Sequence, residues 1–156
     1  MLALNTSNTI DDLRGKYFQI DSIEQADLYI DKLEKESSAE AKGYRAALNF
    51  TKSRLYKFPL KKMKYFKRGK SILEDTIEEN RNNLELRYLR YCIQKKVPEF
   101  LNYSDQIEQD LALIINEISK SDMSDNTKSI ILTNILTVND LSGKDKLDLE
   151  TLLNNL

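Results

Sequence analysis

Apolar residues recur every three or four positions through most of the chain, which is the spacing of one face of an α-helix. The clearest stripe is Ile107, Leu111, Ile114 and Ile118. The pattern predicts seven or eight helices with few residues between them. We expect these helices to begin near residues 9, 22, 38, 59, 84, 104, 126 and 147.

Polar and turn-forming residues mark several of the helix ends. Ser22 and Gln25 have the spacing of a capping box, in which side chains satisfy the free N–H groups of a first turn. Pro59 suits the first position of a helix, where its missing N–H is not needed. The turn at 80–83 and Pro98 are expected to end the fourth and fifth helices.

Only four Gly and two Pro occur in 156 residues, and sheets need many tight turns made from these residues. The composition therefore favours an all-α fold. Connections of two to eight residues make sequential helices antiparallel neighbours. No linker-like or low-complexity segment interrupts the pattern, so we expect one domain over residues 1–156.

Residues 69–89 resemble the junction between two tetratricopeptide repeats. Gly69 and Thr76 match the small positions of a second helix, and Leu73 matches its large apolar position. Asn82 and Asn83 match the turn that precedes the next first helix. The resemblance implies helical hairpins in a short right-handed stack, and a wider likeness over about residues 40–120 points to small bacterial proteins of this kind without an assigned activity.

The same stretch departs from the family pattern at two positions. Arg81 stands where the family has a proline, and Arg87 where it has a large aromatic residue. Successive first helices are also spaced by about 45 residues instead of the usual ~34. The resemblance is therefore to a divergent relative, and it implies no catalytic residues.

Several classes of chemistry lack their usual residues. The chain has no His, which removes the commonest metal ligand and the usual proton shuttle. Cys92 is the only cysteine and is expected to be a small buried hydrophobic residue. We therefore expect no enzyme activity, no cofactor and no metal. No window is apolar enough to span a membrane, and we expect a cytoplasmic protein, or a periplasmic one if a signal peptide has been removed.

The charge is strongly segregated although the formal net charge is −1. Residues 41–73 contain eleven Lys or Arg and no Asp or Glu, and acidic segments flank them on both sides. Lys61, Lys64 and Arg68 form one line on the fourth helix, opposite its apolar stripe. This line is a candidate site for phosphates or for an acidic protein surface. The alternative is an ordinary solvated face that pairs with acids of the protein itself.

A second candidate site lies on the fifth helix, which has two apolar faces and so is expected to have neighbours on both sides. The remaining strip carries Arg87, Arg90 and Gln94, with Tyr91 beside it. In an exposed groove of a helical repeat, two Arg would clamp a carboxylate of an extended peptide. The alternative is that each Arg pairs with an acid on an adjacent helix.

These patterns favour a non-catalytic module that binds a protein or peptide, with an acidic partner as one option. The main alternative is nucleic-acid binding along the fourth helix, which the acidic flanking segments and a pI near 5.6 disfavour. The sequence leaves open whether the last helix caps the stack or pairs with a second copy.

Overall fold

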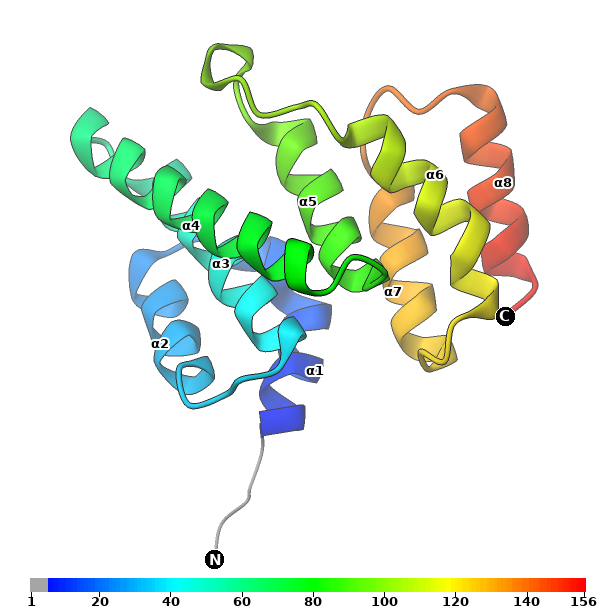
Figure 1. The fold of residues 1–156 in the computed structure, drawn as a ribbon, viewed down its shortest axis with the longest axis horizontal. Coiled ribbons are helices and arrows are strands. Elements are labelled where there is room, and N and C mark those ends of the chain that lie inside the picture. The colour runs from blue at the N-terminus through cyan, green and yellow to red at the C-terminus, as the bar shows by residue number, and fades with distance from the viewer. Residues whose placement is uncertain (1–5) are drawn as a thin grey trace, which may run out of the picture. The chain divides into compact units, whose positions relative to one another are not determined.

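The computed structural model of the chain describes residues 6–156, with side chains from residue 9 onward. Within that range it contains eight α-helices, three short 3-10 helices and no strand, so the all-α prediction is confirmed (Figure 1). The chain separates into two compact units that meet between Asn82 and Asn83. The expected single domain and right-handed stack remain predictions.

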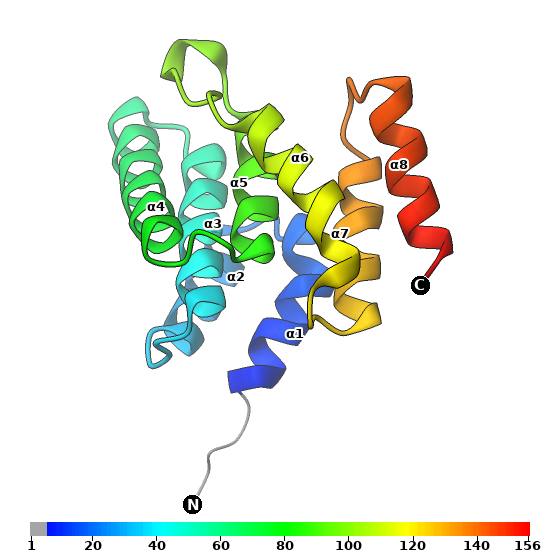
Figure 2. The same cartoon turned by 45° about the vertical axis from the view of Figure 1, so that its right-hand side comes forward.

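The first unit is built around α3. It contains α1 (Thr6–Lys16), the 3-10 helix η1 (Tyr17–Gln19), α2 (Ile23–Leu33), α3 (Ala39–Leu55) and α4 (Pro59–Glu79). α2 and α4 both pack on α3, and α3 and α4 run antiparallel as a long hairpin (Figures 1 and 2). α3 is accordingly the most buried helix of this unit, with side chains such as Tyr44, Ala47 and Leu48 almost inaccessible to water.

Gly69 allows α3 and α4 to approach each other closely. A Cβ atom at this position would lie 2.9 Å from the ring of Phe50 and 3.0 Å from the carbonyl oxygen of Ala46. Both distances are shorter than a side-chain carbon tolerates without a shift of its neighbours. The small residue is thus required by helix packing, and the rings of Phe50 and Phe66 fill the adjacent space edge to face at 5.5 Å.

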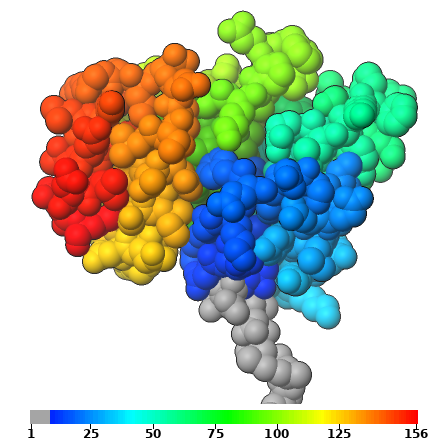
Figure 3. Space-filling view, turned by 180° about the vertical axis from the view of Figure 1, so that it is seen from behind, coloured from blue at the N-terminus to red at the C-terminus, as the bar shows by residue number. Residues whose placement is uncertain are grey.

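The second unit contains α5 (Leu84–Lys96), η2 (Glu99–Leu101), α6 (Ile107–Glu117), η3 (Ile118–Lys120), α7 (Asp125–Leu136) and α8 (Gly143–Asn154). α5 packs on α6 and α7, and α8 packs on α6 and α7. Asn134 of α7 donates a hydrogen bond of 2.8 Å to the buried hydroxyl of Tyr88 on α5. Seen from behind, α1 and α2 cover much of the visible surface of the first unit, with the start of α4 beside them, and α7 and α8 cover much of that of the second (Figure 3).

Most predicted helix starts agree with the structure. Ser22 and Ser38 accept hydrogen bonds from the third residue that follows each of them, and Pro59 is the first residue of α4. Three starts were wrong. α1 begins at Thr6 and not near 9. α6 begins at Ile107 and not near 104, and α8 begins at Gly143, four residues before the expected start, because Ser142 caps the N–H of Asp145.

Candidate functional site: a cationic surface on α4

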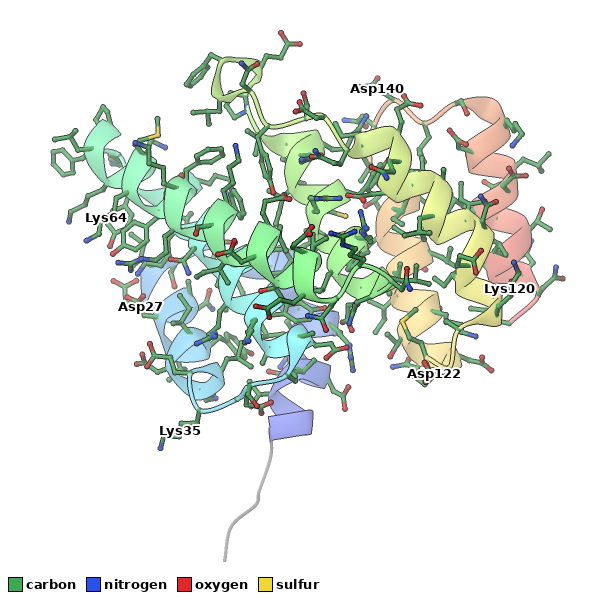
Figure 4. All side chains as sticks on the ribbon, in the orientation of Figure 1. Asp27, Lys35, Lys64, Lys120, Asp122 and Asp140 are labelled. Atoms are coloured by element: carbon green, nitrogen blue, oxygen red, sulfur yellow. The ribbon has the colours of Figure 1, made fainter. Side chains whose placement is uncertain are left out.

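Five cationic side chains lie exposed at the start of α4 and on the turn before it. We call them the α4 patch: Lys57, Lys61, Lys64, Lys67 and Arg68. They include the three predicted residues of the fourth helix. Figure 4 labels Lys64, which points outward from α4, and Asp27, which extends from α2 on the same side of the unit.

Two stacked tyrosines lie beside the α4 patch and position its side chains. The rings of Tyr56 and Tyr65 are nearly parallel, with an interplanar angle of 12° and 5.1 Å between centroids. Lys61 Nζ lies 4.9 Å from the Tyr56 centroid. Lys64 and Arg68 each place their charge 5.5 Å from the centroid of Tyr65. Cation–π contacts of this length restrain long side chains while the charges stay accessible to water.

Lys52 on α3 is a buried cation that contacts the ring of Tyr65. It is 6% exposed, its Nζ lies 4.1 Å from the Tyr65 centroid, and it makes a 2.5 Å ion pair with Asp27 on α2. Burial lowers the pKa of Lys52, but Asp27 and Tyr65 outweigh that effect and the pKa lies above its ordinary value. The Asp27 carboxylate is therefore already paired with a buried cation.

The α4 patch has no carboxylate partners of its own. None of its five side chains forms an ion pair within the part of the chain that the structure describes. Three other bases of the acid-free segment have internal partners: Lys42 pairs with Glu79 at 4.0 Å, Lys52 pairs with Asp27, and Lys62 donates to the backbone oxygens of Ser53 and Arg54. The alternative of pairing with acids of the protein itself thus holds for Lys42 and Lys52 and not for the α4 patch.

The charges of α4 also oppose the dipole of their own helix. The first turn of α4 carries Lys61 and Lys62 and no acid, and its last turn carries Glu78 and Glu79 and no base. A helix prefers the opposite arrangement by about 0.3–1 kcal/mol per charge. α2, α3, α5, α6, α7 and α8 each have an acid in the first turn. Helix stability therefore does not explain the position of the patch.

The positive potential of this surface lowers the pKa of Tyr65. Partial burial raises its pKa, but the Tyr56 hydroxyl and the ammonium groups of Lys52 and Lys64 outweigh burial. The pKa of Tyr65 therefore lies below the ordinary value of 10.0. A lowered pKa means that negative charge is favoured at this point of the surface.

The second predicted strip occupies a different environment. Arg90 donates two hydrogen bonds to Asp110 of α6, from Nε at 2.7 Å and from a terminal nitrogen at 2.8 Å. Arg87 donates to the same carboxylate at 3.0 Å. We call these three residues the α5 seam. Arg90 is 4% exposed and Asp110 is fully buried, so the expectation that this strip lines an open groove was wrong.

Gln94 and Tyr91 of α5 are also buried. Gln94 donates to the side-chain oxygen of Gln106 at 2.8 Å and accepts from the Gln106 backbone N–H at 3.3 Å. Tyr91 is 1% exposed, and burial raises its pKa to about 12. The alternative of internal pairing therefore describes α5 better, with one shared acid in place of a separate acid for each Arg.

Asp110 is the residue that sequence reasoning missed. It lies three residues after Ile107 and four before Ile114, on the apolar stripe of the helix. A charged residue on a core-facing stripe is almost always paired inside the protein, and that position was the available signal.

Cys92 is buried as expected, and burial raises the pKa of its thiol to about 12. Among the described residues no group of three His, Cys, Asp or Glu is arranged to hold a metal ion. None of the helices in residues 6–156 combines the length and the apolar character needed to cross a bilayer.

No protein-family model matches the chain, and comparisons with curated proteins and with solved structures give no significant match. The resemblance to tetratricopeptide repeats therefore remains a prediction. The functional argument rests on the geometry and charge of the α4 patch.

Proposed function

We propose that the protein is a non-catalytic interaction module that binds an acidic segment of a partner protein through the α4 patch. The observation that carries this proposal is the set of five exposed cations without a carboxylate partner among the described residues. The position of Lys61 in the first turn of α4 supports it, because a cation there opposes the helix dipole and costs folding free energy. An acidic partner would offset this cost in a complex.

The arrangement suits an extended acidic segment. Lys61, Lys64 and Arg68 follow one another along the side of α4 at intervals of three and four residues, which is about 5–6 Å of helix axis. Carboxylates two residues apart on an extended peptide have a similar spacing. The Tyr56 and Tyr65 rings restrain the cations, which reduces the entropy lost on binding.

Nucleic-acid binding is the second candidate, because single-stranded nucleic acids bind surfaces that combine aromatic rings and positive charge. The rings of this site are already occupied. Tyr65 has Tyr56 stacked against it and three cations within 5.5 Å of its centroid. Base stacking would have to displace these contacts, so an acidic protein segment is the better fit.

The test is the affinity for a fluorescein-labelled polyglutamate peptide, measured by anisotropy at low salt. We expect binding that weakens as salt rises, and Lys64→Glu with Arg68→Glu is expected to weaken it by roughly tenfold or more. Lys35→Glu is the matched control, because Lys35 is exposed in the same unit and lies outside the patch. Equal binding by the double variant and the control would refute the proposal, and tighter binding of single-stranded DNA than of polyglutamate at the same salt would favour the second candidate.

A further inference from the structure

Three large apolar side chains lie exposed where α3 turns into α4. We call them the hairpin tip: Phe58, Leu60 and Met63, which are 70%, 87% and 37% exposed. Isolated exposed apolar residues are normal, but three within six positions form a patch that water solvates poorly.

The hairpin tip is convex. The first turns of α4 extend beyond the ends of α1 and α2 in both ribbon views, so the tip is an outward projection of the first unit (Figures 1 and 2). A protein partner usually receives apolar anchors in a shaped pocket, whereas a lipid surface accepts them without a specific shape. The form of the tip therefore suits a fluid apolar phase.

Cations lie directly behind the apolar side chains. Lys57 precedes Phe58, and Lys61, Lys64 and Lys67 follow Leu60 within about 10 Å of helix axis. An interfacial helix buries its apolar side chains about 5–10 Å deep at the boundary between headgroups and acyl chains. With Phe58 and Leu60 at that depth, these ammonium groups reach the lipid phosphates.

The charge along α4 would also orient the molecule. The bases of α4 lie in its first half, from Lys61 to Lys70, close behind the hairpin tip. Its acids lie at the far end, from Glu74 to Glu79. The field of an anionic surface attracts the first half of α4 and repels the second half. The hairpin would therefore approach such a surface with the tip first.

We propose that the hairpin tip docks on an anionic lipid bilayer, with Phe58 and Leu60 inserted at the headgroup boundary and the neighbouring lysines on lipid phosphates. Each lysine near such a surface strengthens attachment by about fivefold, and the apolar side chains supply the second signal that stable attachment needs. This inference goes beyond the proposed function, because its essential residues are apolar and the acidic-segment proposal does not use them.

The experiment uses tryptophan as a reporter of insertion, because the chain contains no Trp. Phe58→Trp is mixed with vesicles of phosphatidylcholine alone or with added phosphatidylglycerol. We expect a blue-shifted emission and quenching by brominated acyl chains with the anionic vesicles only. Phe100→Trp is the matched control, because Phe100 is 83% exposed and has no cation next to it in sequence: Glu99 precedes it and Leu101 follows it. This control is expected to show neither the blue shift nor the quenching.

A sedimentation assay with the same vesicles tests which residues are responsible. Phe58→Ser with Leu60→Ser is expected to lower partitioning by roughly tenfold or more, while Phe100→Ser leaves it unchanged. If the tip substitutions leave partitioning unchanged, surface charge alone accounts for the contact and the proposal is overturned. If the emission of Phe58→Trp shifts to the blue without vesicles, and the shift grows with protein concentration, the hairpin tip binds a second copy of the chain. That result would also overturn the proposal. The tip variant is expected to retain polyglutamate binding, so failure here is distinguishable from failure of the proposed function.

Discussion

The α4 patch and the α5 seam present cations at the same helical spacing and have opposite roles in the structure. Lys61, Lys64 and Arg68 of α4 are exposed and have no carboxylate partner among the described residues. Arg87 and Arg90 of α5 converge on one fully buried acid. The decisive difference is the residue that faces the cations on the neighbouring helix, and not the spacing of the cations themselves.

The comparison shows what each region contributes. The shared acid of the α5 seam carries three hydrogen bonds from two guanidinium groups, which fixes α5 against α6 in one register. The α4 patch adds little to its own unit, because exposed cations near a helix N-terminus are unfavourable. Substitutions are therefore expected to change stability at the α5 seam and binding at the α4 patch.

The largest predicted effect is the loss of the shared acid. Asp110→Asn removes the charge of the buried carboxylate that accepts hydrogen bonds from both Arg87 and Arg90. Because Arg90 is 4% exposed, we expect the free energy of unfolding to fall by about 3–5 kcal/mol. Urea unfolding measures this change, with Asp105→Asn as the exposed control on the preceding loop, expected within about 0.5 kcal/mol of the parent. A loss below about 1 kcal/mol for Asp110→Asn would show that the α5 seam does not need its acid.

The second-largest predicted effect concerns Gly69, where α3 and α4 approach each other closely. Gly69→Ala forces a carbon against Phe50 and the Ala46 carbonyl oxygen, which costs about 1–3 kcal/mol and exceeds the gain of up to about 1 kcal/mol in helix propensity. Gly15→Ala is the control, because nothing lies within 4 Å of a Cβ at that position. Thermal unfolding is expected to show a lowered midpoint for the first variant and an unchanged or raised midpoint for the second. Equal midpoints would argue against tight packing of α3 on α4.

Charge reversal in the α4 patch is expected to have little net effect on stability. Lys61→Glu places an acid in the first turn of α4, which favours the helix by about 0.3–1 kcal/mol, and it loses one exposed cation–π contact worth about 0.5–1 kcal/mol. We therefore expect a free energy of unfolding within about 1 kcal/mol of the parent, measured in the same urea experiment. A loss as large as that of Asp110→Asn would mean that the patch is structural.

The smallest effect is spectroscopic and compares one tyrosine from each region. The pKa of Tyr65 lies below 10.0, whereas burial raises the pKa of Tyr91 to about 12. A titration of tyrosinate absorbance is expected to lose a component with a pKa below 10.0 in Tyr65→Phe and a component with a pKa of about 12 in Tyr91→Phe. Because the folded-state pKa of Tyr65 is lowered, its contribution to stability is present above the unfolded pKa and is lost as the pH falls through the folded pKa.

The same titration tests the origin of the lowered pKa. Lys52→Met removes the buried ammonium group 4.1 Å from the Tyr65 ring centroid, so the pKa of Tyr65 is expected to rise. Lys35→Met is the control and is expected to leave the curve unchanged. An unchanged curve for Lys52→Met would contradict the electrostatic description of the patch.

The helices were predictable from the sequence because local signals specify them. The apolar period, the Ser22 and Ser38 caps and Pro59 act within a few residues of each helix end. The start of α8 was missed because Ser142 caps it in a polar stretch without an apolar stripe. These successes and this failure both concern contacts that are short-range in sequence.

The functional assignments depended on long-range contacts and were less predictable. Asp110 lies 20 residues from Arg90 in sequence, and only the packing of α6 on α5 brings the two together. The stacking of Tyr56 on Tyr65 likewise requires the α3–α4 hairpin to close. A helical wheel identifies the face on which a side chain lies, but it does not identify the group on the opposite helix.

The central claim is that the cations of α4 are available to a partner and those of α5 are not. The most direct test is an amide NMR titration of the isotope-labelled protein with polyglutamate at low salt. The account predicts chemical-shift changes concentrated between Lys57 and Arg68, with residues 87–94 unaffected. Shift changes centred on Arg87 to Gln94, or no changes at all at low salt, would contradict it.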